Sequence, residues 1–265
     1  MHRQIMQHLE EHCILSHAQH GFRKRLSCET QLLLTLRDSS AVLDNSEQIG
    51  AILLEFSTAF GKVPYEHLGV KRCHYGIRGN ILAWIKSFLS NRTQQVLVEG
   101  VKSSPAPVTS GVSQVSVLGP LLFLVYINDM PARVKSTTRL LKDDSLLYRK
   151  IRCPADTQTL QEDLNTLQEW EQTWKTEFNP SKCEVLLITR KRNPIQATYS
   201  IHGHQLANVK TGKYIGVTFA SDLSWKAHVD ARTKSANSFL PAQKPIQLPE
   251  RHQTTVLQVT SQTCP

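Results

Sequence analysis

Residues 138–148, TRLLKDDSLLY, decide the fold of this chain. Two adjacent aspartates, Asp143 and Asp144, lie in this stretch between two short apolar runs. Polar residues between apolar runs favour a tight turn that joins two antiparallel strands. We therefore predict a β-hairpin that presents a pair of carboxylates at its turn.

A second predicted strand ends in a carboxylate. Residues 51–54, AILL, form an apolar run that leads into Glu55, which is typical of a buried strand. Glu55, Asp143 and Asp144 together could bind divalent cations, because Mg²⁺ prefers oxygen ligands and two such ions can stabilise phosphoryl transfer. The alternative from the pattern alone is that Asp143 and Asp144 form only a solvated turn.

The remaining periodicity predicts a mixture of helices and strands. Helices are predicted over residues 4–17, 27–43, 80–89, 118–130 and 154–174, with a further one opened by Pro64. Strands are predicted over residues 94–99, 183–189 and 213–218. This element order, with a hairpin in the middle, favours an α+β fold over a regular alternation of strands and helices.

Composition narrows the class of partner. The 265 residues include 31 Lys and Arg against 22 Asp and Glu, and the net charge of +9 favours nucleic acid. The longest strongly apolar stretch, Val117–Ile127, is too short to span a bilayer, so we expect no membrane partner. Because the N-terminus lacks an apolar signal region, we also expect an intracellular protein with reduced cysteines.

Several segments, in the same order over about residues 18–230, resemble the reverse transcriptases of non-LTR retrotransposons of the long interspersed, jockey-like kind. These segments are QHGFRK (19–24), FSTAF (56–60), KVP (62–64), SGVSQ (110–114), SVLGPLLF (116–123), YIND (126–129), the aspartate pair, NPSK (179–182) and YIGV (214–217). The chain is similar to such a domain in truncated and partly degenerate form.

The resemblance implies a right-hand polymerase palm with partial fingers, whose antiparallel sheet carries a catalytic Asp-Asp hairpin. It implies an RNA-directed DNA polymerase, a nucleotidyltransferase that uses a two-metal mechanism with Mg²⁺ or Mn²⁺. The implied partners are an RNA template, a DNA primer and deoxynucleoside triphosphates. Since the family acts on RNA and chromosomal DNA, the nucleus is the location that the resemblance favours.

The resemblance also implies roles for individual residues. Catalysis and metal binding fall to the three carboxylates, with a lysine near the leaving group: Glu55, Asp143, Asp144 and Lys182. Contacts to nucleotide, template or nascent base pair fall to Phe56, Phe60, Arg23, Lys24 and Gln114. The alternatives are that Phe60 is a core residue and that residues 23–25 form a solvated basic turn.

The same resemblance divides the chain into four parts. Residues 1–17 form an N-terminal helical segment, and residues 18–194 form the fingers and palm. Residues 195–238 form a primer-grip hairpin and the start of a thumb. Residues 239–265, rich in Pro, Gln and Thr, are predicted to be a disordered, frame-altered tail.

Several residues depart from the family at or beside the predicted site. Glu55 stands in place of an Asp, and a displacement of roughly 1 Å can cost about a hundredfold in rate. Gly61 replaces a further Asp. Lys142 replaces a small residue, and its ammonium could pair with the adjacent aspartates. Val115 replaces a Gly, which would strain the loop if that position has a positive φ. Glu55, Lys142 and Val115, together with the loss of resemblance to the family's thumb after Ser238, predict weak or no turnover.

Three other interpretations remain open from the sequence. The chain could be a catalytically dead remnant that still binds RNA or DNA. It could be a relic that does not fold stably, against which a cooperative unfolding transition would count. Residues 8–12, HLEEH, match a zinc-peptidase pattern, but no third ligand is identifiable.

Overall fold

The computed structural model describes residues 1–239. The chain divides into two compact units, residues 1–225 and 226–265. The second unit contains one described helix, α7 (Lys226–Phe239). Beyond residue 239, the predicted tail lies outside the described residues.

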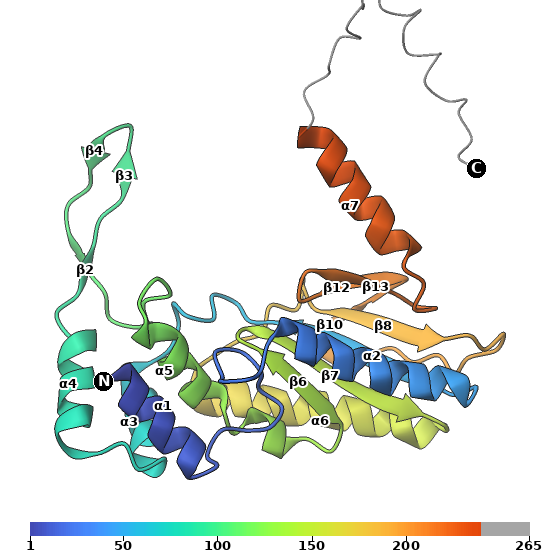
Figure 1. Cartoon of the computed structure of the whole chain (residues 1–265), viewed down its shortest axis with the longest axis horizontal. Helices are drawn as coiled ribbons and strands as arrows, with labels where there is room; N and C mark the ends of the chain where they lie inside the picture. Colours follow the sequence, from blue (N-terminus) through green and yellow to red (C-terminus); the bar gives the residue numbers. More distant parts are fainter. Residues whose placement is uncertain (240–265) are drawn as a thin grey trace, which may run out of the picture. The chain divides into compact units, whose positions relative to one another are not determined.

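A five-stranded sheet forms the centre of the first unit (Figure 1). The strands run in the order β11 (Ala207–Val209), β8 (Glu184–Thr189), β1 (Gln48–Glu55), β7 (Asp144–Ile151) and β6 (Thr137–Leu141). Every neighbouring pair is antiparallel except β11 and β8. The unit is therefore a mixed α/β fold on a mainly antiparallel sheet, as the sequence predicts.

Both faces of this sheet are covered, which explains why β1 is apolar over nearly its whole length. Successive side chains of a strand point to opposite faces. Ile52 and Leu54 pack in one core cluster with residues of α5 and α6, whereas Ala51 and Leu53 pack in another with residues of α2, β12 and β13.

The first unit contains six α-helices among the described residues. They are α1 (His2–Glu11), α2 (Cys28–Asp44), α3 (Tyr65–His74), α4 (Gly79–Leu89), α5 (Leu118–Ile127) and α6 (Pro154–Trp174), with the short 3₁₀ helix η1 (Met130–Arg133) after α5. Helix α1 ends earlier than predicted because Cys13 takes a left-handed conformation with φ of 51°. Leu33 of α2 is 65% exposed.

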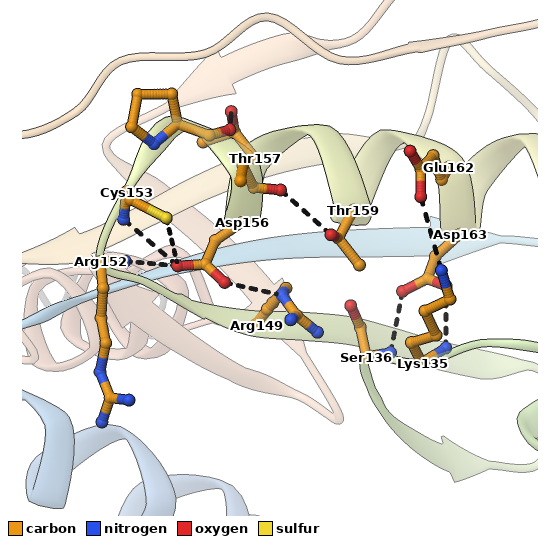
Figure 2. Close-up of polar contacts among 12 residues, drawn as sticks. Lys135, Ser136, Arg149, Arg152, Cys153, Asp156, Thr157, Thr159, Glu162 and Asp163 are labelled. Carbon is orange, nitrogen blue, oxygen red and sulfur yellow. Dashed lines mark hydrogen bonds and ion pairs between the residues drawn. The ribbon is translucent and has the colours of Figure 1, made fainter.

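Two carboxylates of α6 tie this helix to the central strands (Figure 2). Asp156 accepts a hydrogen bond from the backbone N–H of Arg152 at 2.9 Å and one from Arg149 at 3.2 Å. Asp163, which is buried, accepts one from the backbone N–H of Ser136 at 2.8 Å. These bonds anchor the outer ends of β6 and β7, so they help to fix the hairpin that the two strands form.

Short strands lie outside the central sheet. They are β2 (Thr93–Gln94), β3 (Leu97–Val98), β4 (Val101–Lys102), β5 (Ala106–Pro107), β9 (Ser200–Ile201), β10 (His204–Gln205), β12 (Thr211–Tyr214) and β13 (Val217–Ala220). The strands β2 to β5 form an exposed arm that projects beyond α4, away from the central sheet (Figure 1). Among residues 1–239, no helix has the length and apolar character needed to cross a membrane.

Two predicted strands are broken by turns. Residues 94–99 contribute to both β2 and β3, and the arm turns at Glu99 and Gly100, whose φ values are 49° and 84°. Residues 213–218 contribute to both β12 and β13, which pair through a turn at Ile215 and Gly216 with φ of 49° and 77°. Glycine adopts positive φ at little cost, so Gly100 and Gly216 are the sequence signals of the two turns.

Candidate functional site

A cleft of about 640 Å³ opens where β1 ends. Its walls come from the β6–β7 hairpin, the segment before β8 and the strand β12. Charged side chains of both signs line it: Glu55, Asp143, Asp144, Lys182, Glu184 and Lys213. All the sequence-predicted metal ligands and the predicted catalytic lysine are in this set.

Strand pairing brings the three predicted carboxylates to the cleft. Glu55 is the last residue of β1 and lies opposite Asp144, the first residue of β7. Asp144 also pairs with Leu141 of β6, so the hairpin turn consists of Lys142 and Asp143. The aspartates therefore differ in position, because Asp143 lies in the turn and Asp144 opens the strand.

The carboxylates repel one another in this arrangement. The pKa of Asp144 is raised, first by burial and then by the negative charges of Asp143 and Glu55. Lys142 and Lys213 act in the opposite direction but do not cancel the effect. A cation in the cleft would relieve this repulsion.

Lys182 provides such a charge from within the protein. Its Nζ lies 2.5 Å from Oε1 of Glu55, and both side chains are about half exposed. The backbone holds the two residues together, because the N–H of Asn179 donates to the carbonyl of Glu55 at 2.7 Å. A turn from Asn179 then places Lys182 at the cleft.

The donor atoms suit a divalent cation, although they are not gathered around one position. Within residues 1–239, no three His, Cys, Asp or Glu side chains are grouped so that they could hold a metal ion. At the cleft, the Glu55 carboxylate is engaged by Lys182, which leaves Asp143 and Asp144. Carboxylate oxygens are the ligands that Mg²⁺ prefers, so the donor atoms, but not their arrangement, suit such an ion.

Lys142 does not form the predicted pair with the aspartates. Of the ion pairs among the described residues, none joins Lys142 to Asp143 or Asp144. Its Nζ lies 5.0 Å from the centre of the Phe22 ring, and its backbone has φ of 60°. This left-handed conformation is unfavourable for a residue with a side chain.

The two predicted nucleotide-contacting phenylalanines lie in the core. Phe56 is 5% exposed and stacks on Phe178 with ring centres 4.5 Å apart. Phe60 is 7% exposed and packs against Phe123 at 4.6 Å. Neither lines the cleft, so a role for Phe56 or Phe60 at a nucleotide stays a prediction.

The other predicted nucleotide contacts also lie away from the cleft lining. Arg23 donates to both carboxylate oxygens of Glu10, at 2.9 and 3.0 Å, and its side chain is 11% exposed. Lys24 and Gln114 are exposed. Arg23 thus fastens the segment after α1 to that helix, and its binding to a nucleotide stays a prediction.

The loop that contains Val115 packs against the segment after β1. Gly111 has φ of 85°, and a Cβ there would lie 2.5 Å from the carbonyl oxygen of Gly61. Val115 is 99% exposed and is not among the residues with positive φ. The strain anticipated at Val115 is therefore absent, whereas Gly111 is a position in this loop that requires glycine.

Sequence reasoning missed two charged residues of the cleft, Glu184 and Lys213. Both lie on predicted strands, but nothing in a strand pattern indicates which site its side chains face. The histidines of the HLEEH segment have ordinary partners: Nε2 of His8 lies 2.8 Å from the carbonyl of Tyr75, and Nδ1 of His12 lies 2.9 Å from the carbonyl of His8. The His8 contact docks α1 on the end of α3, whereas the His12 contact lies within the α1 segment.

Comparison with known proteins places this fold and cleft in a family. Residues 1–219 match the family model described as reverse transcriptase (RNA-dependent DNA polymerase). The chain belongs to the reverse transcriptase family. The predicted resemblance to jockey-like, non-LTR retrotransposons is confirmed by the relatives that follow.

This reverse transcriptase domain is 29% identical over 220 residues to the RNA-directed DNA polymerase from mobile element jockey of Drosophila melanogaster. The match covers 80% of this chain and 24% of that protein. The domain is also 30% identical over 242 residues to the probable RNA-directed DNA polymerase from transposon BS of the same organism. That match covers 85% of this chain and 26% of the transposon BS protein. The domain therefore spans about a quarter of the length of these relatives.

Solved structures share the fold of this reverse transcriptase domain. Telomerase from Candida albicans, in complex with a fragment of telomeric RNA, superposes with a TM-score of 0.58 at 12% identity, covering 84% of this chain and 38% of that one. Apo telomerase from Candida tropicalis superposes with a TM-score of 0.57 at 12% identity, covering 85% of this chain and 40% of that one. At these identities the likeness concerns the fold alone.

Proposed function

We propose that the cleft at the end of β1 is a polymerase palm site for RNA-directed DNA synthesis. Asp143 and Asp144 would hold Mg²⁺ or Mn²⁺, and Glu55 would join them after leaving Lys182. The observation that carries the proposal is the β1–β7 register, which sets Glu55 opposite Asp144 beside a cleft that also contains Asp143. We extend this proposal to a division into fingers and palm over residues 18–194 and a primer grip within residues 195–238.

The side chains of the cleft suit nucleotidyl transfer. A bound divalent cation would supply positive charge to the attacking and leaving oxygens. Asp143 and Asp144 would orient that charge toward the substrate. Lys182, whose ammonium is half exposed in the cleft, could give a proton to the leaving pyrophosphate, and Lys213 would add positive charge on the β12 side.

The proposed partners are an RNA template, a DNA primer and deoxynucleoside triphosphates. The net charge of +9 favours binding to such polyanions, and this binding would weaken as salt rises. Turnover would be weak because Lys182 holds Glu55 at 2.5 Å, so a cation must displace the ammonium before all three carboxylates can act. A nuclear location is part of the same proposal.

Primer extension on an RNA template tests this proposal. The native chain is compared with Asp143→Asn and Asp144→Asn, and with Asp222→Asn as a control, since that residue is absent from the cleft lining. We expect slow, Mn²⁺- or Mg²⁺-dependent extension by the native chain and the Asp222→Asn variant, and none by the other two. Extension that survives Asp143→Asn would contradict the proposed role of the aspartates.

A second candidate function is nucleic-acid binding without catalysis. The Glu55–Lys182 ion pair favours this function, because it engages one of the three carboxylates that would bind a metal ion. Salt-dependent binding of RNA, together with no extension by either the native chain or its Glu55→Asp variant, would support this alternative. Extension by the native chain would exclude it.

A further inference from the structure

A buried carboxyl group lies in the last turn of α6, beside the segment that frames the cleft. The side chain of Glu171 is 1% exposed, and its Oε2 lies 2.8 Å from Nε2 of His202. Its other oxygen accepts a hydrogen bond from the backbone N–H of Phe178. Burial raises the pKa of Glu171 to about 7.

Phe178 belongs to the segment that frames the end of β1. The N–H of Ser57 donates to the carbonyl of Glu177 at 2.7 Å. The N–H of Asn179 donates to the carbonyl of Glu55, also at 2.7 Å. The two bonds flank Phe178, so the acceptor that Glu171 provides fixes the centre of this pairing.

The same segment carries Lys182 to the cleft. The N–H groups of Lys182 and Cys183 donate to the carbonyl of Asn179 at 3.0 and 3.1 Å, which closes a turn before β8. Lys182 then meets Glu55 through its ammonium. A connected set of hydrogen bonds thus leads from Glu171 to the ion pair in the cleft.

The imidazole is held in place from its own side. His202 lies in the turn between β9 and β10, and its backbone N–H donates to Oε1 of Gln168 at 2.6 Å. Gln161, on the same helix, bonds to both the N–H and the carbonyl of Ser200, each at 2.9 Å. The small hairpin is therefore fastened along α6, with His202 directed at Glu171.

We infer that Glu171 and His202 form a positioning pair, which holds the segment 177–183 and through it sets Lys182 and Glu55 in the cleft. This inference rests on the proposed function of the cleft. The titratable and charged groups around Glu171 are His202, Glu177 and Cys183, and Lys62 pairs with Glu177 at 2.7 Å.

The pair responds to pH in a defined direction. A charged carboxylate is costly to bury, so loss of the proton from Glu171 favours opening of the segment, which returns Glu171 to water. Rising pH should therefore loosen the segment 177–183, and falling pH should tighten it. A carboxyl group that served only to fill space would give no such dependence.

Amide hydrogen exchange, corrected for intrinsic rates, tests the inference on the full chain. We expect protection of Ser57, Phe178 and Asn179 to fall as pH rises from about 5 to about 8, by up to about tenfold per pH unit. In Glu171→Gln, which keeps an acceptor oxygen and similar volume, protection should persist without this pH dependence.

Further variants separate positioning from general destabilisation. Glu171→Leu should lower protection by about tenfold or more, because the Phe178 N–H loses its acceptor. Glu169→Leu, at an exposed position of α6, should leave protection unchanged. If Glu171→Leu fails to fold, the pH profiles of the native chain and of Glu171→Gln still decide the question.

Alkylation of Cys183 provides a second readout. This buried thiol directly follows Lys182, so its reaction with iodoacetamide reports opening of the segment. We expect faster alkylation in His202→Leu than in the native chain. A native profile independent of pH, or one that Glu171→Gln reproduces, or unchanged Cys183 alkylation in His202→Leu, would overturn the inference. Neither readout requires a cation, nucleic acid or polymerase activity, so this failure is distinct from failure of the proposed function.

Discussion

Lys182→Met is the substitution that most sharply tests how the cleft treats a cation. Met keeps much of the length of the lysine side chain and removes its charge. In the native chain, the ammonium lies 2.5 Å from Oε1 of Glu55. A divalent cation that uses Glu55 must break this pair, so removal of the ammonium should strengthen cation binding.

The exposure of the pair sets the size of this effect. The side chains of Lys182 and Glu55 are 57% and 48% exposed, so solvent screens their attraction. Such pairs are worth roughly 0.2 to 1 kcal/mol. Release of this free energy should lower the Mn²⁺ dissociation constant by roughly 1.4-fold to fivefold.

Mn²⁺ titration followed by electron paramagnetic resonance measures this constant. Lys102→Met, at an exposed position of β4, removes the same charge away from the cleft and serves as the control. We expect tighter binding in Lys182→Met only. Equal or weaker Mn²⁺ binding in Lys182→Met than in the native chain would refute the competition between ammonium and cation.

Three further predictions concern stability. Arg72 is 1% exposed, its Nη1 has no hydrogen-bond partner, and burial lowers its pKa to about 10. Arg72→Met should therefore raise the free energy of unfolding by roughly 1 to 3 kcal/mol in urea titrations. A lower free energy of unfolding in this variant would contradict the prediction. The pKa of Glu171 is raised from 4.5 to about 7, so the folded state binds an extra proton between these values and stability falls as pH rises through this window. In urea titrations from about pH 5 to about pH 8, the free energy of unfolding of the native chain should fall by up to about 3 kcal/mol, and that of Glu171→Gln should not. The same dependence on pH in both proteins would show that Glu171 is not the titrating group. Gly111→Ala should lower the free energy of unfolding by about 1 to 3 kcal/mol, because Gly111 has a positive φ and lies close to the carbonyl of Gly61. Gly61→Ala should change it by no more than about 0.5 kcal/mol. Equal thermal unfolding midpoints for the two variants would contradict this prediction.

The central strands and the long helix were predictable because their patterns match their surroundings. The apolar run before Glu55 lies in β1, and it is apolar on both faces because both faces of this strand are covered. The helix predicted over residues 154–174 is α6, which buries Leu160, Leu164 and Leu167. The aspartate pair marked a hairpin because charged residues interrupt two apolar runs. Local periodicity sufficed in each of these cases.

Side-chain partners in the site could not be predicted in the same way. Lys182 and Glu55 are 127 positions apart in the sequence, and their ion pair depends on how the segment before β8 crosses the end of β1. Arg23 was expected at a nucleotide, but a nearby carboxylate, Glu10, holds it. Neither pairing leaves a periodic signal, because each depends on tertiary geometry.

Backbone conformation was also beyond reach of the sequence. The resemblance drew attention to Val115 as a strained position, whereas positive φ values occur at Gly111 in the same loop, at Lys142 in the hairpin turn, and at Ile215 and Gly216 in the cleft lining. Only the packing of the loop against Gly61 reveals why Gly111 is required. Similarly, the conformation of Lys142 follows from the two-residue connection between β6 and β7.

The most direct test of the central claim is to locate Mn²⁺ by anomalous scattering from crystals of the native chain and of Asp143→Asn. We predict an anomalous peak in the cleft, within coordination distance of the carboxylates of Asp143 and Asp144, which Asp143→Asn weakens or abolishes. A native cleft without a peak at saturating Mn²⁺, or a peak that Asp143→Asn leaves unchanged, would contradict the assignment of this cleft as the polymerase site.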